Sequence, residues 1–165
     1  MRVLKSPNKL TNLLLHSKLE NKRIGFVPTM GYLHEGHVSL IRRARKENDC
    51  VVVSIFVNPT QFGPKEDFKR YSRDLRRDLK MLSKEKADFV LTPSVRGIYP
   101  ENFSAFFEPG SLANTLCGLK RPGHFRGVVT VVKRLFDIAI PDSAYFGQKD
   151  YQQARIIEAM VRRFK

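Results

Sequence analysis

Hydrophobic residues along the chain gather into short runs that are separated by longer segments of mixed polarity. Four runs have the length of a strand, and they cover residues 23–27, 49–57, 87–91 and 143–146. The run at 49–57 is apolar along its length, which is typical of a strand covered on both faces. We expect the first run to end at Pro28, because proline has no N–H to donate to a sheet.

The segments between these runs have the periodicity of helices. Ser6 and Pro7 are typical of a helix start, and the helix that follows is expected to end near residues 18–21. An apolar stripe that begins at Val38 predicts a second helix. We further expect an amphipathic helix at 66–86, an extended arm at 99–107, a short helix at 111–117, a helix at 128–138 and a last helix from 151 onward.

The alternation of strands with helices defines the expected fold class. It indicates an α/β domain in which a parallel sheet is covered by helices on both faces, the three-layer arrangement of Rossmann type. A flavodoxin-like sheet, with the same layers and another strand order, is the alternative. Ligands of such sheets bind outside the carboxyl ends of the strands, so we expect function in the segments that follow the strands.

The stretch at residues 26–44 carries the main candidate chemistry. It runs from a strand through a glycine-containing turn into a helix whose first turn contains His37. His34 and His37 are three residues apart and share a helix face, and the unpaired N–H groups at a helix start attract phosphate. Two solvent-facing histidines on a capped helix are the alternative. The preceding strand, the following helix and the interposed Gly36 favour phosphate binding.

Two other strand ends carry polar side chains. Asn58 and Gln61 follow the second run, and their amides suit a hydroxy acid or a carboxylate; a turn stabilised by Asn58 is the alternative. After the fourth run comes a turn with Lys149, which can pair with phosphate, and Asp150, which can cap the next helix or accept from a ribose hydroxyl. Gln153 lies one helical turn further on and is expected to face the same pocket.

Composition bounds the class of protein. A chain of 165 residues that is 42% hydrophobic suffices for one domain with a core, and no apolar run is long enough for a bilayer. Two cysteines without metal-ligand spacing favour a reduced, cytoplasmic protein. The net charge of +14 is compatible with nucleic acid. Its basic residues are interspersed with acidic ones, however, which is typical of solvated helix faces and favours a small anionic ligand.

Four stretches together carry a resemblance to a known family. They read PTMGYLHEGH at 28–37, FVNPTQF at 56–62, RPGHFRGVVTVV at 121–132 and FGQKDYQQ at 146–153. The first resembles the HIGH-type motif of nucleotidyltransferases and class I aminoacyl-tRNA synthetases. All four, in this order, resemble the pantoate–β-alanine ligase family over nearly the whole chain.

The resemblance implies a reaction in two steps. Pantoate attacks the α-phosphate of ATP to give pantoyl adenylate and pyrophosphate, and β-alanine then displaces AMP to give pantothenate. It also implies Mg²⁺ that accompanies ATP, bound by the phosphates rather than by a metal site of the protein, and a homodimer, with no nucleic acid or membrane as partner. Another HIGH-motif nucleotidylyltransferase and a basic nucleic-acid-binding module are the alternative functions.

The resemblance also assigns roles to single residues. It implies that His34, His37 and Lys149 stabilise charge at the phosphorus. For ATP binding it implies Met30, Gly31, Tyr32, Leu33, His34, Glu35, Gly36, His37, Gly147, Gln148, Lys149 and Asp150. For pantoate it implies Gln61, Gln153, Asn58, Val132 and Leu135, with Gln61 also near β-alanine.

Members of the family continue into a smaller C-terminal domain with a KMSKS-like segment. The resemblance therefore implies that residues 1–165 are a single ATP- and pantoate-binding domain of a longer enzyme. We expect such a domain to bind ATP weakly and to make little pantothenate by itself, because an open site leaves its charges screened by water.

Overall fold

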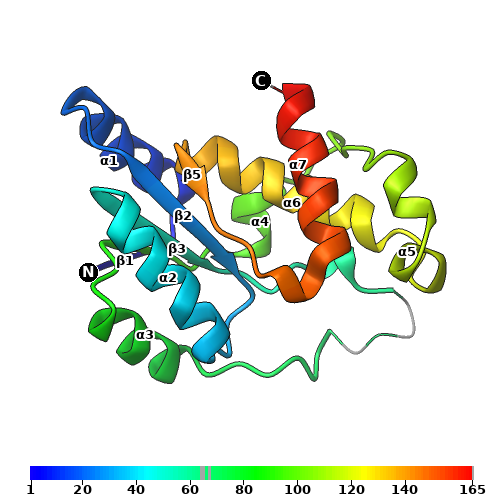
Figure 1. The fold of residues 1–165 in the computed structure, drawn as a ribbon, viewed down its shortest axis with the longest axis horizontal. Coiled ribbons are helices and arrows are strands. Elements are labelled where there is room, and N and C mark those ends of the chain that lie inside the picture. Colours follow the sequence, from blue (N-terminus) through cyan, green and yellow to red (C-terminus); the bar gives the residue numbers. More distant parts are fainter. Residues whose placement is uncertain (64–65, 67, 165) are drawn as a thin grey trace.

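The computed structural model describes residues 1–63, 66 and 68–164, and these form an α/β fold around a parallel sheet (Figure 1). The described strands pair in the order β1-β4-β3-β2-β5, and each recorded pairing is parallel. Their bounds are β1 Arg2–Leu4, β2 Ile24–Thr29, β3 Cys50–Ile55, β4 Phe89–Leu91 and β5 Ser143–Ala144. The predicted parallel α/β class is confirmed.

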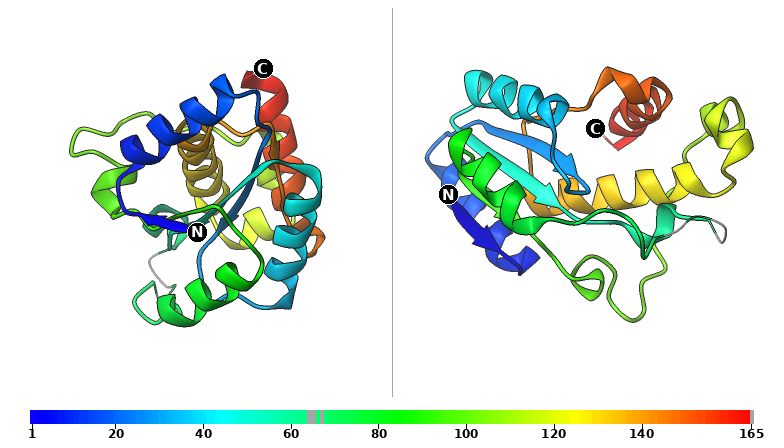
Figure 2. Two further views of the ribbon diagram at one scale, coloured as in Figure 1. Left: turned by 90° about the vertical axis from the view of Figure 1, so that its left-hand side faces the viewer. Right: turned by 90° about the horizontal axis from the view of Figure 1, so that it is seen from below.

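Helices cover both faces of this sheet, as the side views in Figure 2 show. The α-helices are α1 Pro7–Leu19, α2 Glu35–Glu47, α3 Leu75–Lys84, α4 Val95–Ile98, α5 Cys117–Lys120, α6 His124–Ala139 and α7 Tyr151–Phe164. Short 3-10 helices are η1 Pro59–Gln61, η2 Ser111–Asn114 and η3 Gln148–Asp150. None of the helices in the described part of the chain is long and apolar enough to cross a membrane.

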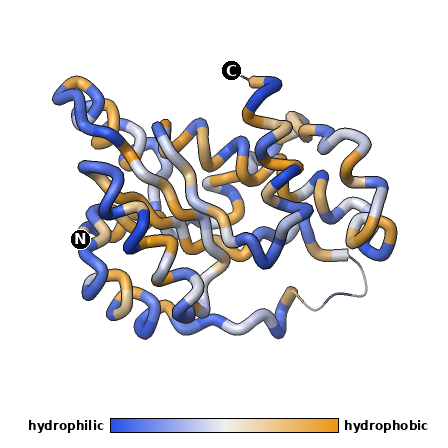
Figure 3. The backbone as a smooth tube through the Cα atoms, viewed as in Figure 1, coloured by the Kyte–Doolittle hydropathy of each residue, from blue (hydrophilic) through white to orange (hydrophobic). Residues whose placement is uncertain are grey.

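The alternation of side chains along the strands divides the core into two layers. Phe26 and Val52 point to the face covered by α1, α6 and α7, whereas Val27, Val51 and Val53 point to the face covered by α2 and α3. All five side chains are fully buried, and each contributes about 1.5–3 kcal/mol of hydrophobic stabilisation. Figure 3 shows the consequence, since hydrophobic positions concentrate in the central strands and polar positions on the outer helices.

One prediction about the strands was wrong, and one strand was missed. Pro28 does not end β2 but lies inside it, in register with Ser54 of β3. The neighbour on the other side, β5, pairs only with Gly25 and Phe26, so Pro28 faces no partner that would need its N–H. The strand β1 was not predicted, because three residues give too short a pattern to detect.

The helix expected at 66–86 was also wrong in its extent. The helix α3 begins only at Leu75, where Asp74 caps it by accepting from the Arg77 N–H at 3.0 Å. Leu75, the first residue of α3, is exposed although it is apolar. The residues before it form a loop in which Phe62 packs against Phe68 and Tyr71. Residue 67 of the expected helix lies outside the described residues.

The other helix predictions agree more closely with the structure. Ser6 caps α1 as expected, by accepting from the Lys9 N–H, and the helix ends at Leu19. The helix expected from 128 begins four residues earlier, at His124. The short helix expected at 111–117 is replaced by η2 and α5.

Candidate functional site

The turn between β2 and α2 has an unusual backbone. Gly31 has φ +83° and Tyr32 has φ +52°, so both lie in the left-handed region. A side chain at Gly31 would be strained twice, because its Cβ would also lie 3.0 Å from Ile55 and 3.1 Å from an Asp78 oxygen. This turn therefore requires glycine, and it brings the chain sharply round to the start of α2.

The Asp78 carboxylate of α3 holds the backbone of this turn. Asp78 is 1% exposed, and its two oxygens accept from the backbone N–H groups of Tyr32 and Leu33, each at 2.8 Å. Hydrogen bonds to an ionised acceptor are stronger than neutral ones. Sequence reasoning missed this role, because Asp78 stands in a run of mixed charges and its partners are more than 40 residues away.

The two predicted histidines lie together at the start of α2. His34 is its N-cap, and its Nδ1 accepts from the Gly36 N–H at 3.1 Å. His37 Nδ1 accepts from the His34 N–H at 3.4 Å, and the ring centroids are 4.2 Å apart. The rings thus cap the helix, as the alternative interpretation supposed, and they also stand side by side, as the phosphate interpretation requires.

The hydrogen bonds of the rings determine which nitrogen faces outward. An imidazole that accepts at Nδ1 carries its proton on Nε2. Both rings therefore direct an Nε2–H donor away from the helix. Burial lowers the pKa of His37, and the nearby His34 lowers it further, against smaller opposing effects of Asp78 and Asp150. His37 is accordingly neutral at neutral pH, with Nε2 as its donor nitrogen.

The other residues predicted for ATP around this turn have mixed environments. Leu33 is fully buried, so only its backbone is available. Tyr32 is exposed, with the Arg77 guanidinium 5.2 Å from the centre of its ring. Glu35 is exposed and pairs with Arg42 at 2.6 Å. Gly36 is exposed, and a Cβ there would lie 2.8 Å from the His34 ring, so glycine allows the cap to form.

The second predicted turn lies after β5, the neighbour of β2 in the sheet. Gly147, Gln148, Lys149 and Asp150 are all exposed. Because β5 pairs in parallel with β2, the turns that follow these two strands leave the same edge of the sheet. The charges of Lys149 and Asp150 also act on His37, whose pKa they shift in opposite directions. The structure therefore brings the two predicted phosphate-binding elements together at the carboxyl edge of the sheet.

The predicted amides after β3 are also close to the first turn. Gln61 donates to the Met30 sulfur at 3.2 Å and accepts from Asn58 at 3.1 Å. Asn58 is 1% exposed, and its Nδ2 also donates to the Gly127 carbonyl, while its Oδ1 accepts from the Tyr99 hydroxyl at 2.8 Å. Because these bonds occupy the Asn58 amide, the geometry gives Asn58 the role of holding Gln61.

The remaining residues predicted for pantoate belong to α6 and α7. Val132 and Leu135 are buried in the same core cluster as Phe26 and Phe56. Gln153 is half-buried, and its side-chain amide has no hydrogen-bond partner among the described residues. Sequence reasoning missed Gly127 on α6, where a Cβ would lie 2.3 Å from the Thr60 carbonyl oxygen. That close approach fixes η1 against the start of α6.

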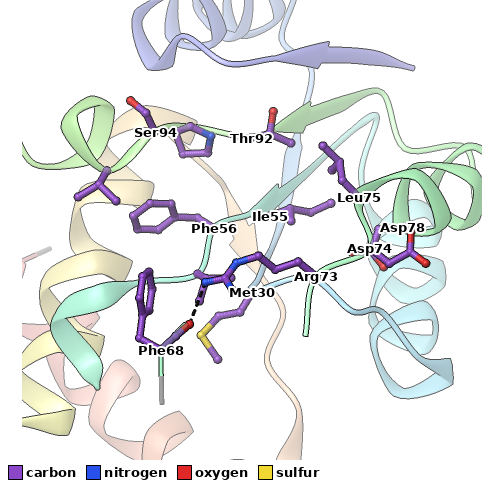
Figure 4. Close-up of a pocket in the computed structure, with 14 residues that line it drawn as sticks. Met30, Ile55, Phe56, Phe68, Arg73, Asp74, Leu75, Asp78, Thr92 and Ser94 are labelled. Atoms are coloured by element: carbon purple, nitrogen blue, oxygen red, sulfur yellow. Dashed lines mark hydrogen bonds between the residues drawn. The ribbon is translucent and has the colours of Figure 1, made fainter. Parts of the chain in front are cut away.

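Two cavities adjoin these residues. A cleft of about 340 Å³ at the carboxyl ends of β2, β3 and β4 is lined by Met30, Phe56 and Asp78 (Figure 4). Its Arg73 donates to the carbonyl of Phe68, so that charge is already engaged. A larger groove of about 750 Å³ lies between α6, β5 and α7 and includes Gln148 among its lining residues. At the histidine turn, His34 is exposed and His37 is half-buried. Among the described residues, no three His, Cys, Asp or Glu side chains form a group that would hold a metal ion.

Comparison with known proteins gives a consistent result. Residues 2–165 match the family model described as pantoate-beta-alanine ligase. The pantothenate synthetase of Thermosipho melanesiensis is 59% identical over 162 residues, which are 98% of this chain and 58% of that protein. The one from Thermotoga neapolitana is also 59% identical, with the same coverage. The chain thus spans little more than half the length of these relatives.

Solved structures resemble the fold closely. The pantothenate synthetase of Thermus thermophilus has a TM-score of 0.91 and 47% identity, covering 99% of this chain and 58% of that one. The pantoate-beta-alanine ligase of Francisella tularensis, solved in complex with beta-gamma ATP and beta-alanine, has a TM-score of 0.93 and 43% identity. It is covered to 63%, and this chain to 99%.

Proposed function

We propose that this chain, which belongs to the pantoate-beta-alanine ligase family, supplies the ATP- and pantoate-binding part of an enzyme that condenses pantoate with β-alanine. The products would be pantothenate, AMP and pyrophosphate, formed through a pantoyl adenylate. The observation that carries the proposal is the pair of Nε2–H donors on His34 and His37, which stand at a helix start beside the Gly147–Asp150 turn.

These groups suit transfer to phosphorus. Attack by the pantoate carboxylate on the α-phosphate builds negative charge on the phosphate oxygens, and positioned donors stabilise that charge. His34 and His37 would donate from Nε2, and Lys149 would add a positive charge from the opposite turn. The α2 start contributes the positive end of its dipole to the same place. The backbone of residues 30–37 and 147–150 would hold the nucleotide.

The pantoate subsite would lie between the two turns and the α6 helix. Gln61 and Gln153 would bind the hydroxyl and carboxylate groups, because an amide both donates and accepts. Val132 and Leu135 would contribute apolar packing from α6 for the dimethyl carbon, and Asn58 would keep Gln61 in place. Gln61 would also approach β-alanine in the second step.

The proposal includes Mg²⁺, which would enter with ATP. Mg²⁺ in such sites is bound largely by substrate phosphates and water, with one or two carboxylates. The proposal therefore assigns Mg²⁺ to the phosphates of ATP and not to a metal site of the protein. The homodimer and the cytoplasmic compartment are further proposals from the family resemblance. Sedimentation of the purified chain tests the first of these.

Calorimetric titration tests the proposed function directly. ATP with Mg²⁺ is titrated into the chain first, pantoate into the ATP-loaded chain second, and single-stranded RNA into the free chain in a separate run. The proposal expects binding of ATP and of pantoate. Binding of ATP without pantoate would favour another HIGH-motif nucleotidylyltransferase, and binding of RNA alone would favour the nucleic-acid-binding alternative.

A further inference from the structure

A chain of polar contacts runs behind Gln61 and is not part of the site described so far. His124, the first residue of α6, is 8% exposed, and its Nδ1 lies 2.9 Å from the Gln61 backbone carbonyl oxygen. Its Nε2 lies 3.0 Å from Nη1 of Arg121. Both ring nitrogens of this buried histidine are therefore engaged, one by the Gln61 carbonyl oxygen and one by the Arg121 guanidinium.

These contacts continue from Arg121 through Glu66 to Gly63, two residues after Gln61. Arg121 forks onto Glu66, with Nε to Oε1 at 2.5 Å and Nη2 to Oε2 at 3.0 Å. Glu66 Oε2 also accepts from the Gly63 N–H at 2.9 Å. The loop that begins at Gln61 is thus tied at two points to the start of α6, and His124 makes the tie nearest to the Gln61 side chain.

The partners of His124 require it to be neutral. A guanidinium only donates, so Arg121 donates to Nε2, and that nitrogen carries no proton. The ring proton then resides on Nδ1 and is donated to the Gln61 carbonyl oxygen. A proton added to Nε2 would face the Arg121 donor directly and would remove the acceptor on which this contact depends.

We propose that neutral His124 is a positioning residue that fixes the Gln61 backbone for pantoate binding, and that protonation of His124 releases it. The proposal rests on the proposed function of the Gln61 side chain. The charged groups that act on His124 are Arg121 and Glu66 from the contact chain and Asp150 from η3. Burial lowers the pKa of His124, the Gln61 contact opposes this, and Arg121 lowers it further.

Two substitutions separate the two ring nitrogens. In His124→Asn the side-chain amide keeps a donor near the position of Nδ1 and cannot titrate. In His124→Gln the amide oxygen reaches the position of Nε2, but the donor to Gln61 is lost. His16→Asn is the matched control, because His16 is an exposed histidine on α1.

Pantoate is titrated calorimetrically into each ATP-loaded variant between pH 5 and pH 8. We expect His124→Gln to weaken pantoate binding about tenfold at pH 8, the scale of one buried hydrogen bond, with ATP affinity unchanged. The wild-type chain is expected to lose pantoate affinity toward pH 5, and His124→Asn to lose none. Equal affinity of His124→Gln and wild type at pH 8, or an acid loss that persists in His124→Asn, overturns the proposal.

An NMR titration of the wild-type chain decides the same question without any variant or ligand. The His124 ring should be protonated at Nδ1 at pH 8, and the Gln61 carbonyl resonance should titrate together with the ring. An Nε2-protonated ring, or a Gln61 carbonyl that ignores the titration, overturns the proposal. A wild-type chain that binds no pantoate contradicts the proposed function instead, and the NMR result then decides the coupling of His124 to Gln61 alone.

Discussion

Replacing Asp78 by asparagine is expected to destabilise the turn that leads into α2. The substitution keeps the shape of the side chain but removes its charge and turns one acceptor oxygen into an NH₂ group. In the structure both oxygens accept from backbone N–H groups, those of Tyr32 and Leu33, at 2.8 Å each. One of these N–H groups would therefore face a donor, inside a site where Asp78 is 1% exposed.

The magnitude follows from these two contacts. The lost hydrogen bond leaves a buried N–H unpaired, which costs about 1–3 kcal/mol, and the surviving bond weakens because its acceptor is no longer charged. We expect a loss of about 2–4 kcal/mol in the free energy of unfolding. Asp78 also raises the pKa of His37, so the substitution should lower that pKa further.

Urea unfolding followed by circular dichroism measures the first effect, and NMR titration of the His37 ring measures the second. Asp74→Asn is the matched control on the same helix. Asp74 caps α3 by accepting from the Arg77 N–H, and asparagine caps helices as well as aspartate does, so this variant should lose little stability. If Asp78→Asn and Asp74→Asn were equally stable, the Asp78 carboxylate would not be what holds the turn.

Three further predictions concern the site and its pH dependence. His37→Ala should weaken ATP binding about tenfold in calorimetry. The free energy of unfolding should change by less than about 1 kcal/mol, because the hydrogen bond that His37 accepts from the His34 N–H is long and exposed. A large loss of stability with intact ATP binding would contradict this. Gln153→Ala should weaken pantoate binding by about 1–3 kcal/mol and leave ATP binding unchanged, because its amide has no partner in the described protein; equal loss for both ligands would mean that it only shapes the pocket. Burial lowers the pKa values of His37 and His124 below 6.5 in the folded chain, so as the pH falls below 6.5 these histidines take up protons in the unfolded chain before they do in the folded one. The free energy of unfolding in urea should therefore decrease as the pH is lowered. A constant free energy of unfolding between pH 7 and pH 5 would refute this.

The sequence predicted the layers of the fold because its strands are buried on both faces. A run such as Val51-Val52-Val53 is typical of a strand covered on both faces, and the alternation of such runs with helical segments indicates an α/β arrangement. The prediction failed for residues 68–74, where side-chain contacts outweigh the helical spacing of the apolar residues. Phe68 and Tyr71 have helical spacing, yet they pack on Phe62, and Arg73 binds the carbonyl oxygens of residues 68, 69 and 71 in a loop.

The same distinction separates the parts of the site that were predictable from those that were not. His34, His37 and Gln61 stand in short motifs whose residue types suit phosphate or a hydroxy acid, so the sequence points to them directly. Two of the residues that hold them lie far from them in the sequence. Asp78 contacts the turn across 46 positions of sequence, and His124 contacts Gln61 across 63. No local pattern encodes such a pair.

This division has a physical reason that bears on how the site works. A group that meets a ligand has to be of one chemical type, whereas a group that supports it needs only to complete hydrogen bonds at the right place. The start of α2 is an exposed surface on which flexible histidines would lose much of their effect, because mobile donors are poorly preorganised. The buried Asp78 carboxylate holds the backbone of the turn before the histidines, and the buried His124 ring holds the backbone of Gln61. Substitutions at these two positions should therefore affect ligand binding as much as substitutions of the groups that contact the ligand.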